Sequence, residues 1–167
     1  MSAAAASRQQ FDHKKRIAVA MAFMTGWADH IFLTKRGFFA TMMTGNSMKM
    51  ADALVAGRIA DAAFFLTVIA SYVLGQGTFR RAELSLKERA LRGAFAPIVA
   101  GCFLLSDYLY WSDATRFLPG ALLSFAWGIV NSVGSEVTGT LIFVVTGAMV
   151  SFLAPLRFER LAPERAC

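Results

Sequence analysis

GWADHIFLTKRGFFATMMTGNSMKM, residues 26 to 50, is the stretch that decides the fold. It begins inside an apolar run that starts at Ile17, and it carries Asp29 and His30 near the far end of that run. An acidic side chain at the centre of a membrane helix costs roughly 2.5–3.5 kcal/mol on insertion scales. A binding site is one arrangement that offsets this cost, so the stretch marks both a membrane helix and a candidate site.

The composition excludes a soluble protein. Of the 167 residues, 56% are hydrophobic and 17% are charged, against about 25% charged in soluble domains. The mean hydropathy is +0.51. The net charge of +6 comes from basic residues that lie between apolar runs, where they act as topology signals and contact anionic lipid rather than nucleic acid. Cys102 and Cys167 give no disulfide framework.

The apolar runs predict an all-α, multi-pass transmembrane bundle with about four spanning helices. The predicted spans are residues 17–34, 62–79, 93–111 and 117–133. The first is expected to stay uncleaved, because no obvious A-x-A cleavage site directly follows its apolar run. The predicted organisation is a polar basic tail at 1–16, a single transmembrane domain at 17–157 and a short polar tail at 158–167.

Two further apolar segments, 37–48 and 137–156, contain a Thr-Gly pair. Residues 37–48 fall short of the roughly 20 that span a bilayer, which favours a segment broken at Thr44-Gly45-Asn46 that re-enters the side it left. A full crossing that extends to Leu54 and includes Lys49 and Asp52 stays open. Basic residues in the tail and at 80–92 place both on the cytoplasmic side of the inner membrane.

The chain also matches itself at an offset of 102 residues. Asp29 falls on Asn131, a near-isostere without the charge. Chance similarity between two apolar helices is the alternative. If the 37–48 segment re-enters, three spans separate the two copies and the second copy is inverted, as in secondary transporters with broken helices. The identical pairs are Phe23/Phe125, Gly26/Gly128, Gly37/Gly139, Thr44/Thr146, Gly45/Gly147 and Leu54/Leu156.

The same residues resemble the signature stretches of the YoaK-like bacterial membrane proteins, catalogued as domain of unknown function 1275. The resemblance covers nearly the whole chain from residue 17 and implies a multi-pass inner-membrane protein of uncharacterised activity. Family members continue with further hydrophobic helices after the second Thr-Gly, so this chain is expected to be a truncated member. The first signature is carried by Gly26, Asp29, Met43, Thr44, Gly45 and Asn46, and the second by Gly128, Asn131, Thr146 and Gly147.

These motifs supply the candidate substrate-binding residues, and each has a structural alternative. Asp29 could bind a proton or cation, or it could reach interfacial water or pair with Lys35 or Arg36. The Thr-Gly-Asn motif could unwind a helix around a ligand, or it could only pack helices closely. His30 is the weaker candidate beside Asp29. The predicted set is Asp29, Thr44, Gly45, Asn46, Asn131, Thr146 and Gly147.

The leading hypothesis is a transporter-like protein for a small solute, with or without coupling to an ion, in which Asp29 and Asn131 face each other near a central site. The alternative is a non-transporting membrane interaction protein. No hydrolase, redox or nucleotide-binding motif is present, so no enzyme activity, cofactor or metal is predicted. The expected partners are the lipid bilayer, a solute or coupling ion, and further copies of the chain in a homo-oligomer.

Overall fold

The computed structural model describes residues 3–85, 88–112 and 115–138. Within these residues all regular structure is helical, and four helices are long and apolar enough to cross a membrane. This confirms the predicted all-α, multi-pass architecture. The helices are α1 (Ala3–Arg36), α2 (Met43–Val55), α3 (Ile59–Glu83), α4 (Glu88–Trp111) and α5 (Phe117–Thr138).

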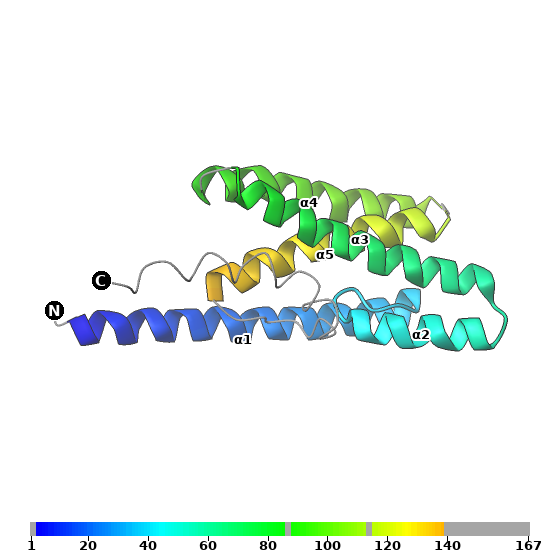
Figure 1. Cartoon of the computed structure of the whole chain (residues 1–167), viewed down its shortest axis with the longest axis horizontal. Coiled ribbons are helices and arrows are strands. Elements are labelled where there is room, and N and C mark those ends of the chain that lie inside the picture. The colour runs from blue at the N-terminus through cyan, green and yellow to red at the C-terminus, as the bar shows by residue number, and fades with distance from the viewer. Residues whose placement is uncertain (1–2, 86–87, 113–114, 139–167) are drawn as a thin grey trace, which may run out of the picture.

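The helix α5 lies at the centre of the bundle and contacts α1, α3 and α4, while α2 packs on α3. The helices α1 and α4 run in one direction and α3 and α5 in the other (Figure 1). The N-terminal end of α1 and the turn from α3 to α4 therefore lie at the same end of the molecule. This arrangement agrees with the predicted placement of the basic tail and the 80–92 segment on one side of the membrane.

The seam between α3 and α5 depends on two glycines. A Cβ atom on Gly75 would lie 2.1 Å from the carbonyl oxygen of Phe125, and one on Gly128 would lie 2.2 Å from the carbonyl oxygen of Tyr72. These distances are far below van der Waals contact with backbone atoms, so only glycine lets the two helices approach so closely. Close approach through small residues is how membrane helices gain packing energy without a hydrophobic driving force.

The helix α2 is too short to span. Its 13 residues rise about 20 Å, against the roughly 30 Å of the hydrocarbon core. It runs in the same direction as α1, and its last turn lies at the end where α3 begins (Figure 1). Its first turn is buried within the bundle, since Met43 and Asn46 are fully buried. The chain therefore turns back at 37–42, and α2 then runs to the end of the bundle at which α1 ends and α3 begins. This path is the re-entrant arrangement.

Two glycines with a positive φ lie at the two ends of the segment formed by the 37–42 connection and α2. Gly37, with φ of 76°, follows the last residue of α1, and Gly57, with φ of 70°, follows the end of α2. At Gly57 the backbone N–H of Arg58 donates to the carbonyl of Ala53 at 2.8 Å, and the N–H of Gly57 donates to Leu54 at 3.0 Å. This pair of bonds is a Schellman motif, which ends a helix with glycine in the αL conformation.

The structure corrects the predicted position of the break. The irregular backbone occupies 37–42, whereas Thr44, Gly45 and Asn46 form the first turn of α2. Glycine at 37 turns the chain before the Thr-Gly pair is reached. The first helix also begins at Ala3 rather than at residue 17, because the polar tail continues the helix. The predicted segment 137–156 lies outside the described residues from position 139 onward.

Candidate functional site

Asp29 is buried on α1, and both of its carboxylate oxygens bind the same residue of the connection to α2. The backbone N–H of Thr41 donates to Asp29 Oδ1 at 2.7 Å, and the Thr41 hydroxyl donates to Oδ2 at 2.5 Å. Hydrogen bonds to an ionised carboxylate are short and strong in this range. Asp29 therefore clamps the connection at a point about 10 Å inside the C-terminal end of α1.

Asn46, in the first turn of α2, binds the same connection. Its amide oxygen accepts the backbone N–H of Phe39 at 2.9 Å, and its amide nitrogen donates to the Phe39 carbonyl at 2.8 Å. The side chain is completely buried. Backbone groups at membrane depth need internal partners, since lipid offers none. Asn46 supplies both partners for Phe39, which allows irregular backbone at this position.

The neighbouring Gly45 and Thr44 behave differently. A Cβ atom on Gly45 would lie 2.4 Å from the ring of Phe39, so glycine lets this ring pack on the first turn of α2. The hydroxyl oxygen of Thr44 is buried and has no hydrogen-bond partner among the described residues. The first turn of α2 also lacks a side-chain cap. The partial positive charge of a helix N-terminus is thus left without a capping side chain inside the bundle.

On α3 and α5 lie further buried polar atoms that have no hydrogen-bond partner within the part of the chain that the structure describes. Tyr72 is fully buried in the core beside Ala40 and Met43, and the charge of Asp29 acts on it electrostatically. An unpartnered buried polar group costs about 1–3 kcal/mol. The interior formed by α3 and α5 therefore contains polar atoms that the described residues leave without a partner. These atoms are the Tyr72 hydroxyl, Ser124 Oγ, Trp127 Nε1 and Asn131 Oδ1.

Arg36 does not pair with Asp29, which was one alternative from the sequence. Its guanidinium forms an ion pair with Asp107 of α4 at 2.7 Å and donates to the Ser106 hydroxyl at 3.2 Å. It also lies over the ring of Tyr110 at 4.3 Å. Arg36 thus ties the C-terminal ends of α1 and α4 together. Among the described residues no Lys, Arg or His side chain forms an ion pair with Asp29.

The second set of predicted residues is only partly described. Asn131 is buried on α5, but its amide oxygen has no partner, and both oxygens of Asp29 are engaged by Thr41. The expectation that Asp29 and Asn131 face each other near a central site stays a prediction. Thr146 and Gly147 lie outside the described residues. His30 is exposed on α1.

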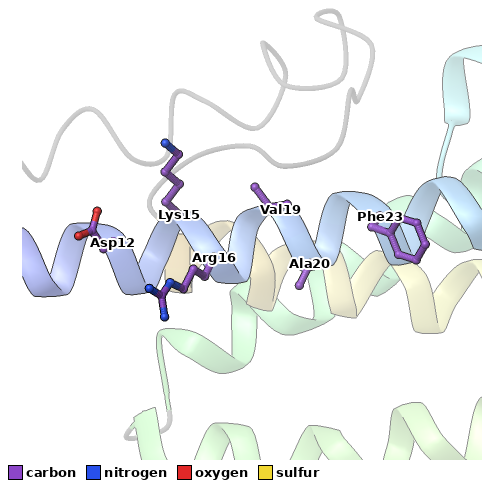
Figure 2. A pocket seen from close by; sticks show the side chains of 6 residues that line it. All are labelled: Asp12, Lys15, Arg16, Val19, Ala20 and Phe23. Carbon is purple, nitrogen blue, oxygen red and sulfur yellow. The ribbon is translucent and has the colours of Figure 1, made fainter.

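A separate hollow lies along the N-terminal half of α1 (Figure 2). None of the predicted site residues lines it. Its charged residues come first along the helix and its apolar residues follow, as expected where a helix passes from the membrane boundary into lipid. The lining residues are Asp12, Lys15, Arg16, Val19, Ala20 and Phe23.

Three residues of the site were missed from the sequence. Thr41 carries one clamp, Phe39 contributes only backbone groups to the other, and Tyr72 lies on a different helix with no motif around it. The position of Thr41, between a turn-forming Gly37 and the apolar start of α2, was the available signal. A threonine there can present both a backbone N–H and a hydroxyl to a nearby acid.

Comparison with known proteins agrees with this architecture. The family model described as "Protein of unknown function (DUF1275)" matches residues 17–162, which is most of the chain and includes both signature stretches. No curated protein and no solved structure gives a match. The chain therefore belongs to the DUF1275 family of proteins of unknown function.

Proposed function

We propose that this membrane protein transports a small solute and that Asp29 binds the coupling proton or cation. The observation that carries the proposal is a buried carboxylate on a spanning helix with no cationic partner among the described residues. An ionisable residue at membrane depth marks an ion or substrate pathway by default.

The re-entrant segment supports the proposal. Secondary transporters place substrate and ion sites at broken helices, where half-helix N-termini and irregular backbone line the site. Here the first turn of α2, the connection 37–42 and the unpartnered hydroxyls of Thr44 and Tyr72 occupy the same part of the bundle as Asp29. The solute would be small and hydrogen-bonding, since hydroxyls are the free groups available to it.

The hydrogen bonds between Asp29 and Thr41 would have two arrangements, one with Asp29 ionised and one with Asp29 protonated. The Thr41 hydroxyl now donates to Asp29 Oδ2. A protonated Asp29 would donate to the Thr41 oxygen instead, because a carboxylic acid is itself a donor. The Thr41 hydroxyl proton would then be free to bind a solute or Tyr72. Binding of one proton at Asp29 would thus loosen the connection and change its partners, which is the kind of linkage that coupled transport requires.

We further propose that the protein lies in the inner membrane with the N-terminus and the α3–α4 turn in the cytoplasm. Basic residues at 8–16 and 80–92 flank these two ends, and cytoplasmic segments carry an excess of Lys and Arg.

The experiment is a solute-uptake screen in cells that express the wild-type chain, Asp29→Asn or Asp52→Asn, with uptake of a solute mixture measured by mass spectrometry. Asp52 is the matched control, because it is an exposed acid on α2. We expect at least one solute to accumulate with the wild type and with Asp52→Asn but not with Asp29→Asn. Equal uptake by the Asp29→Asn and wild-type chains would contradict the assignment.

A second candidate, a non-transporting membrane interaction protein, is favoured by one observation. Both polar groups of Asn46 are fully occupied by Phe39, and Gly45 packs against the ring of the same residue. These contacts account for the Gly-Asn pair through packing alone. For this candidate, no solute would distinguish cells that express the protein from cells that lack it.

A further inference from the structure

Arg36 and Asp107 join two helices that do not pack directly on each other. Among the described residues, no Cα atom of α1 lies within 8 Å of a Cα atom of α4. The side chain of Arg36 crosses this distance and reaches α4, where its guanidinium binds the Asp107 carboxylate at 2.7 Å and the Ser106 hydroxyl at 3.2 Å. Side-chain contacts at one end of the bundle therefore hold these two helices together.

The guanidinium of Arg36 is held on several sides. Its central carbon lies 4.3 Å from the ring centre of Tyr110 on α4 and 4.9 Å from that of Phe32 on α1. A cation over an aromatic ring is attracted by the negative face of the ring. The Ser106 hydroxyl donates in turn to the Pro119 carbonyl of α5 at 2.9 Å, which fixes its position. Arg36 is therefore oriented to receive the carboxylate.

The two members of the ion pair differ in exposure. The side chain of Arg36 is 11% exposed, whereas that of Asp107 is 64% exposed. Ion pairs with access to water contribute little to stability and are weakened by salt. The pair can thus open at a small cost, because the Asp107 carboxylate is hydrated when it leaves the guanidinium.

This ion pair lies between Asp29 and the end of the bundle. Arg36 follows Asp29 by seven residues, so it lies on the same face of α1, two turns and about 10 Å closer to the helix end. Gly37 begins the connection directly after Arg36, and Thr41 of that connection binds Asp29. A movement of α4 away from Arg36 would open a path along this face of α1 toward Asp29.

We propose that the Arg36–Asp107 pair is a gate on the path from this end of the bundle to Asp29. The gate is closed in the structure, and it opens when Asp107 leaves the guanidinium and the C-terminal end of α4 moves away from α1. The proposal rests on the proposed transport function, since the solute and the coupling proton or cation would pass this gate to reach Asp29.

A second ion pair at the same end of the bundle offers a matched control. Arg116, just before α5, binds Asp61 in the first turn of α3 (Figure 1). The helices α3 and α5 already approach closely through Gly75 and Gly128, so they stay packed when this ion pair is lost. Loss of the control pair should therefore leave the path to Asp29 closed.

The experiment measures how fast a buried cysteine near Asp29 reacts with a small, charged, water-soluble thiol reagent. The chain has Cys102 and Cys167 replaced by Ser and is purified in detergent, so the result does not depend on orientation in the membrane. Ala40→Cys and, in a separate chain, Ala28→Cys are the reporters. Ala40 is completely buried next to Thr41, Ala28 is buried next to Asp29, and both changes are small.

Asp107→Ala should speed the labelling of both reporters by about fivefold, the upper range of the change in population that loss of an exposed ion pair produces. Asp61→Ala should change the rate by less than about twofold. Equal rates in Asp107→Ala and the parent chain, or an equal increase in Asp61→Ala, would overturn the gate.

Salt provides a second measurement. Raising the ionic strength should speed labelling in the parent chain, because it screens the ion pair, and should have little effect once Asp107 is Ala. A salt effect of the same size in both chains would overturn the gate. Labelling requires no solute, so it is independent of the uptake screen. The expected labelling differences, combined with no uptake of any solute, would support the gate and contradict only the transport proposal.

Discussion

Replacing Gly128 by Ala should destabilise the bundle, whereas the same change at its repeat partner Gly26 should not. A Cβ atom at position 128 would lie 2.2 Å from the carbonyl oxygen of Tyr72 and 3.1 Å from the backbone nitrogen of Gln76. A Cβ atom at Gly26 would meet nothing within 4 Å. Both positions are in helices, so the gain in helix propensity of about 1 kcal/mol per Gly→Ala is the same at both and cancels in the comparison.

The remaining difference is overpacking at the seam between α3 and α5. A carbon atom approaches a carbonyl oxygen to about 3.3 Å even in a favourable contact, so the helices must separate by about 1 Å at this point. The obstructing atoms belong to the backbone of α3 and cannot rotate away. Overpacking of this kind costs about 1–3 kcal/mol, and occasionally more.

The assay is thermal unfolding of the purified chain in detergent, followed by tryptophan fluorescence and size-exclusion recovery. For a chain of this size each kcal/mol corresponds to a shift of about 2–4 °C. We therefore expect Gly128→Ala to unfold about 2–12 °C below Gly26→Ala. Midpoints that agree within about 1 °C would refute the close contact of α3 and α5 at Gly128.

Two further predictions concern the clamp and the topology. Thr41→Val removes the hydroxyl that binds Asp29 and should cost about 1.5–3 kcal/mol, measured by the same thermal assay, while Thr41→Ser should retain most of the stability. With Cys102 and Cys167 replaced by Ser, Ser85→Cys should react with a membrane-impermeant maleimide only after the cytoplasmic side is opened; labelling of intact spheroplasts would contradict the orientation.

The spans were predictable from the sequence because hydropathy depends only on the apolar runs, and those are long and separated by charges. The half-length of α2 was predictable for the same reason. The start of α1 at Ala3 was not, because a polar segment can extend a membrane helix into water without any apolar signal. The Thr-Gly pair predicts a break several residues after the observed one at 37–42. The break instead follows Gly37, whose positive φ ends α1.

The acid and the amide of the candidate site could be predicted from the sequence, but the groups to which they hydrogen-bond could not. Asp29 and Asn46 stand out as polar residues in apolar surroundings. Their partners are the backbone of Phe39 and both donors of Thr41, and backbone groups have no sequence signature. Tyr72 was also missed, because its burial and its unpartnered hydroxyl follow from the close approach of α3 and α5 rather than from its neighbours in sequence.

The two candidate functions differ in whether they explain the charge on Asp29. Holding the connection requires only an acceptor for the backbone N–H and the hydroxyl of Thr41, and a single amide oxygen has two lone pairs for this purpose. Asn131, at the corresponding position of the repeat, is a neutral residue buried on a spanning helix. A packing role would therefore be met by asparagine at position 29 without the cost of a charge in an apolar span. An acid that no described cation neutralises is instead suited to binding a proton or a cation, which is why the transport proposal explains Asp29 better than packing does.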